Sequence, residues 1–150
     1  MKIVVKEIFD KVNHSLAVIG KGVKDIEFDN IVLSSGQMML VEDYINDALR
    51  RLVSKSHGVF FDKSKDKDSG AFGLYFKSDE SVVESIEIDI DGYLVDYCLF
   101  RVFSLKGMNE MMKVYYDLSE SRYNDLMYYL MKRDVPSVSE KLSGTTGSCE

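Results

Sequence analysis

Residues 92–105, GYLVDYCLFRVFSL, are apolar on nearly every side of a helix. The run is interrupted mainly by Asp96, Arg101 and Ser104. A helix without a polar face is buried on most sides, so this stretch predicts a central helix on which the rest of the chain packs. Lys106 and Gly107 then end it.

Asp96 and Arg101 are charges in a helix that the surrounding residues predict to be buried. Because they are five residues apart, they point about 140° from each other and are badly placed to pair together. Buried charges require partners, so we expect both to pair with neighbouring elements or subunits. The candidates within the chain are Glu7, Asp47, Arg50 and Arg51.

Just upstream, residues 82–90 read VVESIEIDI and alternate apolar with acidic side chains. Alternation is typical of a strand with one face in water. It predicts that the isoleucines at 86, 88 and 90 face inward and the acids at 87, 89 and 91 outward. The strand would stop at the Asp91–Gly92 junction, where Asp91 caps the central helix.

The same acids, followed by Gly92, resemble the first half of a calcium-binding loop, but the match ends there. Such a loop has a bidentate Glu at position 12 and a helix on both sides, whereas Cys98 stands at that position after a predicted strand. The acids of residues 62–68 fail the same comparison, with Lys77 in place of the Glu. We therefore expect solvated charges and no metal site.

Three further segments show the spacing of amphipathic helices. The first has Val5, Ile8, Phe9, Val12, Leu16 and Ile19 on one face and ends near Gly20 and Gly22. The second opens on Ser34–Gln37, which has the spacing of a capping box, and continues with Val41, Tyr44, Ile45, Ala48, Leu49 and Leu52. The last runs from about Met108 to Arg133 with a broad Met and Tyr stripe.

Between the second helix and the predicted strand, aromatic runs at 59–61 and 71–76 flank the polar loop DKSKDKDSG. This arrangement predicts a hairpin with an exposed tip at Asp62–Gly70. After Pro136, the Ser/Gly/Thr-rich tail is too polar to contribute to a core. The expected fold is mainly α (α+β): a four-helix-type bundle spanning residues 1–135, with a β insertion at 58–90 between the second and third helices. Residues 136–150 would form a C-terminal extended arm.

The composition excludes several functional classes. The chain has 150 residues and a net charge of −6, and it lacks the basic cluster that nucleic-acid binding requires. No run approaches the length of a membrane span, and the charged N-terminal segment is unlike a signal peptide. We expect a soluble protein that is made in a reducing cytoplasm, without contact with a membrane.

A catalytic site has few candidate residues. The histidines are His14 and His57, and Cys98, the one thiol in the body of the chain, lies in the most apolar helix. A buried Cys is a packing residue more often than a nucleophile, and the sequence contains no nucleotide-binding, hydrolase or metalloprotease motif. We expect neither an enzyme nor a cofactor. Eight Met and nine Tyr residues instead leave open a protein-binding surface.

Three stretches resemble the phage head–tail connector (adaptor) family. They are VEDYINDALRRLV at 41–53, DGYLVDYCLFRVFSL at 91–105 and YYDLSESRYNDLMYYL at 115–130. The order of elements is also similar: two helices, a β-rich insertion, two long helices and a C-terminal extension. The resemblance covers roughly residues 1–133.

The resemblance implies a structural protein of the virion, made in the host cytoplasm. Members form a homo-oligomeric ring, commonly of twelve subunits, beneath the portal protein at the neck. The ring extends the channel for double-stranded DNA, which passes without specific binding, and offers a docking surface to the next tail or neck protein. An acidic channel wall is compatible with this role because it repels the DNA phosphates.

The resemblance also suggests roles for individual residues. Asp96 and Arg101 match polar positions of the family helix, so packing or inter-subunit pairing is expected of them. The same class of polar residues includes the candidates Arg50 and Arg51. The β tip that contacts the portal or a neighbouring subunit would comprise Asp62, Lys63, Lys65, Asp66, Lys67 and Asp68. The portal-docking arm would include Val138, Lys141 and Leu142. The alternative function is a small intracellular regulatory or inhibitor protein that acts by binding one partner through its Met and Tyr face.

Overall fold

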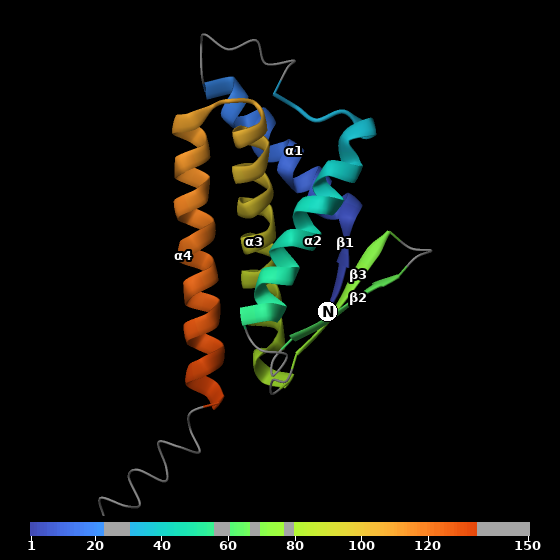
Figure 1. Ribbon diagram of the computed structural model, residues 1–150, viewed down its shortest axis with the longest axis vertical. Coiled ribbons are helices and arrows are strands. Elements are labelled where there is room, and N and C mark those ends of the chain that lie inside the picture. Colours follow the sequence, from blue (N-terminus) through green and yellow to red (C-terminus); the bar gives the residue numbers. More distant parts are fainter. Residues whose placement is uncertain (23–30, 56–60, 67–69, 77–79, 135–150) are drawn as a thin grey trace, which may run out of the picture.

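The computed structural model describes residues 1–22, 31–55, 61–66, 70–76 and 80–134. It is a mainly helical bundle with a small antiparallel sheet (Figure 1). The elements in chain order are β1 (Lys2–Val4), α1 (Val5–Gly22), the short 3-10 helix η2 (Ser35–Gln37), α2 (Met38–Lys55), β2 (Phe61–Asp66), β3 (Ala71–Phe76), α3 (Glu80–Leu105) and α4 (Asn109–Asp134). The fold class predicted from the sequence is confirmed.

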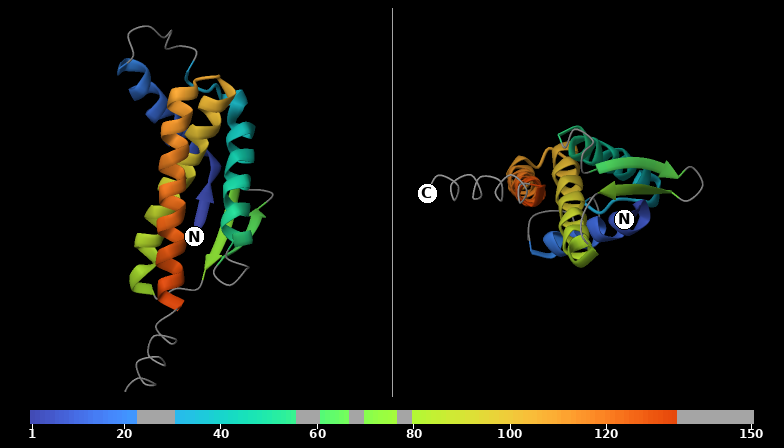
Figure 2. Two further views of the ribbon diagram at one scale, coloured as in Figure 1. Left: turned by 60° about the vertical axis from the view of Figure 1, so that its left-hand side comes forward. Right: turned by 90° about the horizontal axis from the view of Figure 1, so that it is seen from below.

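Helix α3 is the centre of the bundle and packs against α1, α2 and α4. Its fully buried side chains include Tyr93, Leu94, Cys98 and Phe103, as the apolar composition of residues 92–105 predicts. Helix α4 lies along α3 at one edge of the molecule, and the sheet lies at the opposite edge (Figure 2).

The strand predicted at 82–90 is wrong, because α3 begins at Glu80 and includes all of these residues. Ile86 and Ile90 are fully buried, whereas Ile88 is 64% exposed. Residues four apart share one face of a helix and also one face of a strand, so Ile86 and Ile90 fit both structures. Ile88 would be buried in the predicted strand but is exposed in the helix. Asp91 consequently lies within the helix and does not cap it, and Gly92 does not start it.

The β insertion is shorter than predicted and gains a strand from the N-terminus. The sheet order is β1-β3-β2, with Ile3 opposite Phe72 and Phe61 opposite Phe76. The predicted tip at 62–70 is therefore too long, because Asp62, Lys63, Lys65 and Asp66 belong to β2. Strand β2 is at the sheet edge, where charged residues, and lysines in particular, are common.

The helix boundaries follow local chemistry. At Ser34 the predicted capping box is present, since the Gln37 Oε1 accepts a hydrogen bond from the Ser34 backbone at 2.9 Å. Between α3 and α4, Gly107 has a φ of +70°, and the Met108 N–H donates to the Phe103 carbonyl at 3.0 Å. This left-handed glycine cap turns the chain so that α4 runs back along α3.

Candidate functional site

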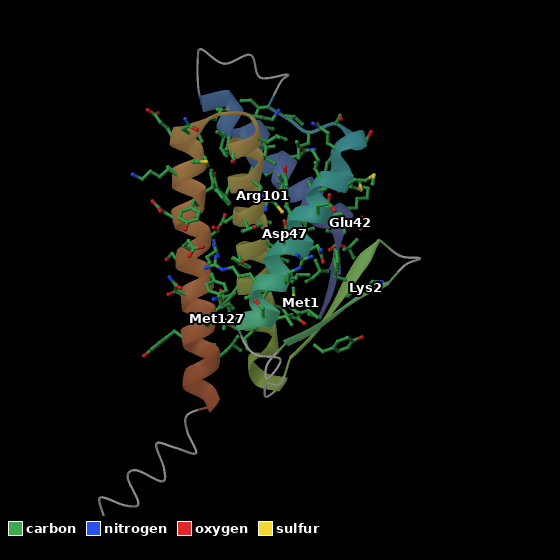
Figure 3. All side chains as sticks on the ribbon, viewed as in Figure 1. Met1, Lys2, Glu42, Asp47, Arg101 and Met127 are labelled. Carbon is green, nitrogen blue, oxygen red and sulfur yellow. The ribbon has the colours of Figure 1, made fainter. Side chains whose placement is uncertain are left out.

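The Arg101 side chain joins α3 to α2. Its Nη1 donates to Asp47 Oδ2 at 3.1 Å and to the Tyr97 hydroxyl at 3.0 Å. Its guanidinium also lies 4.7 Å from the centre of the Tyr44 ring, within the range of a cation–π contact. Figure 3 shows Arg101 and Asp47 beside each other, between the two helices.

Asp96 joins α3 to α4. Arg122 Nε donates to its Oδ2 at 2.5 Å, and the Asp96 side chain is only 13% exposed. Burial raises the pKa of this carboxyl, and the nearby Arg122 opposes the shift. The Arg122 guanidinium lies directly over Gly92, where a Cβ atom would collide with it. The glycine that resembled part of a calcium loop thus provides room for an arginine.

A third charge of α3, Asp91, joins the helix to α1 by accepting a hydrogen bond from Lys11 Nζ at 2.7 Å. Asp91, Asp96 and Arg101 follow one another at intervals of five residues. Each interval turns the side chain about 140° around the helix. The regular spacing therefore directs the three charges to three different helices: Asp91 to α1, Asp96 to α4 and Arg101 to α2.

A further ion pair connects α2 with α4 directly. Arg51 donates from both terminal nitrogens to the two carboxylate oxygens of Glu120, with Nη2 to Oε2 at 3.0 Å. Its guanidinium lies 3.9 Å from the centre of the Tyr123 ring. The hydrogen bonds from Arg51 lower the pKa of Glu120. Together with the pairs of Asp96 and Arg101, this contact links α2, α3 and α4 in a closed cycle.

Aromatic side chains fill the space around these charges. Tyr93 is fully buried, and its ring centroid lies 5.8 Å from that of Tyr123 and 6.1 Å from that of Tyr97. Its hydroxyl has no hydrogen-bond partner among the described residues, and burial raises its pKa. Phe100 meets Tyr116 edge-on at 5.2 Å. The cluster is a packed helix junction.

Sequence reasoning located Arg101, Asp96, Arg51 and Asp47, but it did not identify Arg122 or Glu120 as partners. Both lie on α4 beside the face that packs on α3, with Glu120 half-buried and Arg122 exposed, and their contacts depend on how α4 is aligned with α3. Arg50 is exposed on α2 and has no ion pair with any described residue.

The remaining candidate residues form no reactive group in the part of the chain that the structure describes. Cys98 is fully buried, and burial raises the pKa of its thiol, while His14 is exposed on α1. His57, Lys67, Asp68 and the arm residues Val138, Lys141 and Leu142 lie outside the described residues. Within them, no three His, Cys, Asp or Glu side chains are grouped so as to hold a metal ion.

Comparison with known proteins gives no relative. Neither the protein-family models, nor the curated proteins, nor the solved structures contain a match to this chain. None of the described helices is both long and apolar enough to cross a membrane.

Proposed function

We propose that the chain is a structural protein of the phage neck, forming a ring beneath the portal that joins head to tail and extends the DNA channel. The observation that carries the proposal is the order of the elements in the structure. Two helices are followed by a β-hairpin and two long helices, which is the order in the connector family that segments 41–53, 91–105 and 115–130 resemble.

The character of the charged cluster supports a structural role. Three charges of α3, Asp91, Asp96 and Arg101, each join this helix to another one, and the nearly buried Asp96 pairs with an arginine. Fixed ion pairs of this kind specify how helices align, which a subunit of a regular assembly requires. The net charge of −6 suits a channel wall that DNA passes without binding.

A second candidate function is a regulatory or inhibitor protein that binds one partner. The exposed apolar side chains of α4 favour it, because Val114 and Leu118 are 49% and 44% exposed and Tyr128 is 68% exposed. Scattered apolar side chains are normal on a surface, but several on one helix are typical of a protein-binding face.

Mixing the chain with the cognate portal protein tests the first proposal. We expect a ring-shaped complex in negative-stain electron microscopy and in sedimentation, and a portal that remains without bound chain would refute it. Deleting residues 137–150 provides a second test. Loss of the portal complex with an unchanged melting temperature supports the docking arm, whereas an equal loss of fold stability contradicts it.

A further inference from the structure

The outward face of α4 carries side chains with the spacing of a coiled-coil seam. The residues recur at intervals of four, three, four and three, and all are exposed. These residues, the α4 seam, are Val114, Leu118, Ser121, Asp125 and Tyr128. They fall within an arc of about 80° around the helix, on the side opposite to the one packed on α3. Such a seam is the surface by which one helix packs along another.

The outward face of α2 carries a second seam with the same intervals. Its members, the α2 seam, are Met39, Asp43, Asn46, Arg50 and Val53. Met39 is 76% exposed, Asp43 and Arg50 are exposed, and the other two are half-buried. The buried side chains of α2, such as Ile45 and Leu49, lie on the opposite face.

The two seams are complementary when they run in parallel. Met39 then lies opposite Val114, Asn46 opposite Ser121, Arg50 opposite Asp125 and Val53 opposite Tyr128. An antiparallel alignment would instead place Asp43 opposite Asp125. Arg50 and Asp125 have no ion pair with other described residues, so each has a charge available for the other.

The direction of the helices within one chain agrees with the parallel alignment. Helices α2 and α4 both run from the top of the molecule to the bottom (Figure 1). Copies that are related by rotation about an axis along the helices keep this direction, so α4 of one copy meets α2 of the next in parallel. Contact between two different faces is head-to-tail and closes into a ring when the rotation closes.

We propose that the α4 seam of one copy packs against the α2 seam of a second copy, with Asp125 paired to Arg50. The inference rests on the ring in the proposed function and identifies the surfaces that form it. The contact is partly polar, because Ser121 lies opposite Asn46 and Leu118 lies opposite Asp43. Polar positions in a seam specify alignment at a cost in affinity, so the association is weak and depends on concentration.

Charge reversal tests the pairing. Sedimentation velocity of the full chain over a range of concentrations should show self-association, and Asp125→Arg should reduce it at least about tenfold, the loss of one close ion pair across an interface. Arg50→Asp should do the same, and the double variant should restore association because each copy then presents both reversed charges. Lys113→Glu, a charge reversal at an exposed position of α4 that lies about 100° around the helix from the middle of the seam, is the matched control and should leave association nearly unchanged.

A cross-link tests the alignment independently. In a Cys149→Ser background, where the remaining Cys98 is fully buried, Asp125→Cys mixed with Arg50→Cys should form a disulfide-linked heterodimer. Asp125→Cys mixed with Asp43→Cys should not.

The outcomes separate the interface from the proposed function. A portal-bound ring that is indifferent to Asp125→Arg overturns the interface but leaves the ring intact. Association that is lost by charge reversal and rescued by the double variant, without any portal complex, supports the interface and refutes the neck function. A chain that stays monomeric at every concentration and gives no cross-link overturns the pairing.

Discussion

Two exchanges of a carboxylate for an amide, Asp96→Asn and Glu120→Gln, should differ in their effect on stability although both remove the charge of an acid that pairs with an arginine. Glu120 accepts two hydrogen bonds from Arg51, which lower its pKa. Asp96 accepts one from Arg122, and burial raises its pKa despite that contact. In the folded protein the charge of Glu120 is thus stabilised and that of Asp96 is not.

The size of each effect follows from exposure. Hydrogen bonds to charged groups are worth roughly 1.5–3 kcal/mol when buried, and exposed ion pairs at most about 1 kcal/mol. The Arg51 and Glu120 side chains are 32% and 25% exposed, so we expect Glu120→Gln to lower the free energy of unfolding by about 1–2 kcal/mol. Asp96→Asn removes a buried charge while an amide oxygen still accepts from Arg122. It should leave stability unchanged or raise it by less than about 1 kcal/mol.

The pH dependence follows from the same two shifts. A lowered pKa means that Glu120 contributes stability above its unfolded pKa of about 4.3, and that this is lost as the pH falls through the folded pKa. The deficit of Glu120→Gln should therefore shrink as the pH falls below about 4.3. A raised pKa means that ionised Asp96 costs stability at neutral pH, and that this cost disappears as the pH falls. Any advantage of Asp96→Asn should be confined to the higher pH.

Urea unfolding followed by circular dichroism, at about pH 7 and about pH 3.5, measures both variants against the wild type. If Asp96→Asn loses as much stability as Glu120→Gln at the higher pH, the ion pair with Arg122 outweighs the effect of burial on the Asp96 carboxylate. In that case the contrast between the two ion pairs is wrong.

Three further predictions concern stability in the same urea assay. Ile86→Ala should lower the free energy of unfolding by about 2–5 kcal/mol and Ile88→Ala by less than about 0.5 kcal/mol. Equal losses would favour the strand over the helix at these residues. Arg101→Met should cost about 1–2 kcal/mol through its lost ion pair, hydrogen bond and ring contact, with the exposed Arg50→Met as a near-neutral control, and equal losses would contradict the assignment. Gly107→Ala should cost about 1 kcal/mol because of the positive φ at that position, and a neutral result would argue against the left-handed cap.

The sequence predicted the helices well, because their apolar stripes are long enough to establish a period. It failed at residues 82–90, where Ile86 and Ile90 fit both a strand and a helix and only Ile88 distinguishes them. Helix propagation is favourable once a helix has formed, and no proline separates these residues from the buried run that follows. Three-residue strands such as β1 have too few residues to show a period at all.

The partners of the charges were partly predictable. A charge on a buried helix requires a partner, so Asp47 could be named among four candidate partners, and the structure pairs it with Arg101. The partner of Asp96 could not be named, because the position of Arg122 beside it depends on the packing of α4 against α3. Gly92 contributes to this contact, because its missing side chain leaves the space that the guanidinium occupies.

Three charges at intervals of five residues along a central helix differ from the usual amphipathic pattern in the alignment that they can specify. Intervals of three and four collect charges on one face, while an interval of five distributes them about 140° apart. On α3 this gives one ion pair to each surrounding helix, and most of the partners remain partly exposed. Exposed ion pairs add little stability, so the apolar core supplies the stability and the pairs set the alignment. The inward charges are paired within the chain, whereas Asp125 and Arg50 have no ion pair with another described residue, and for this reason we propose that they pair between copies.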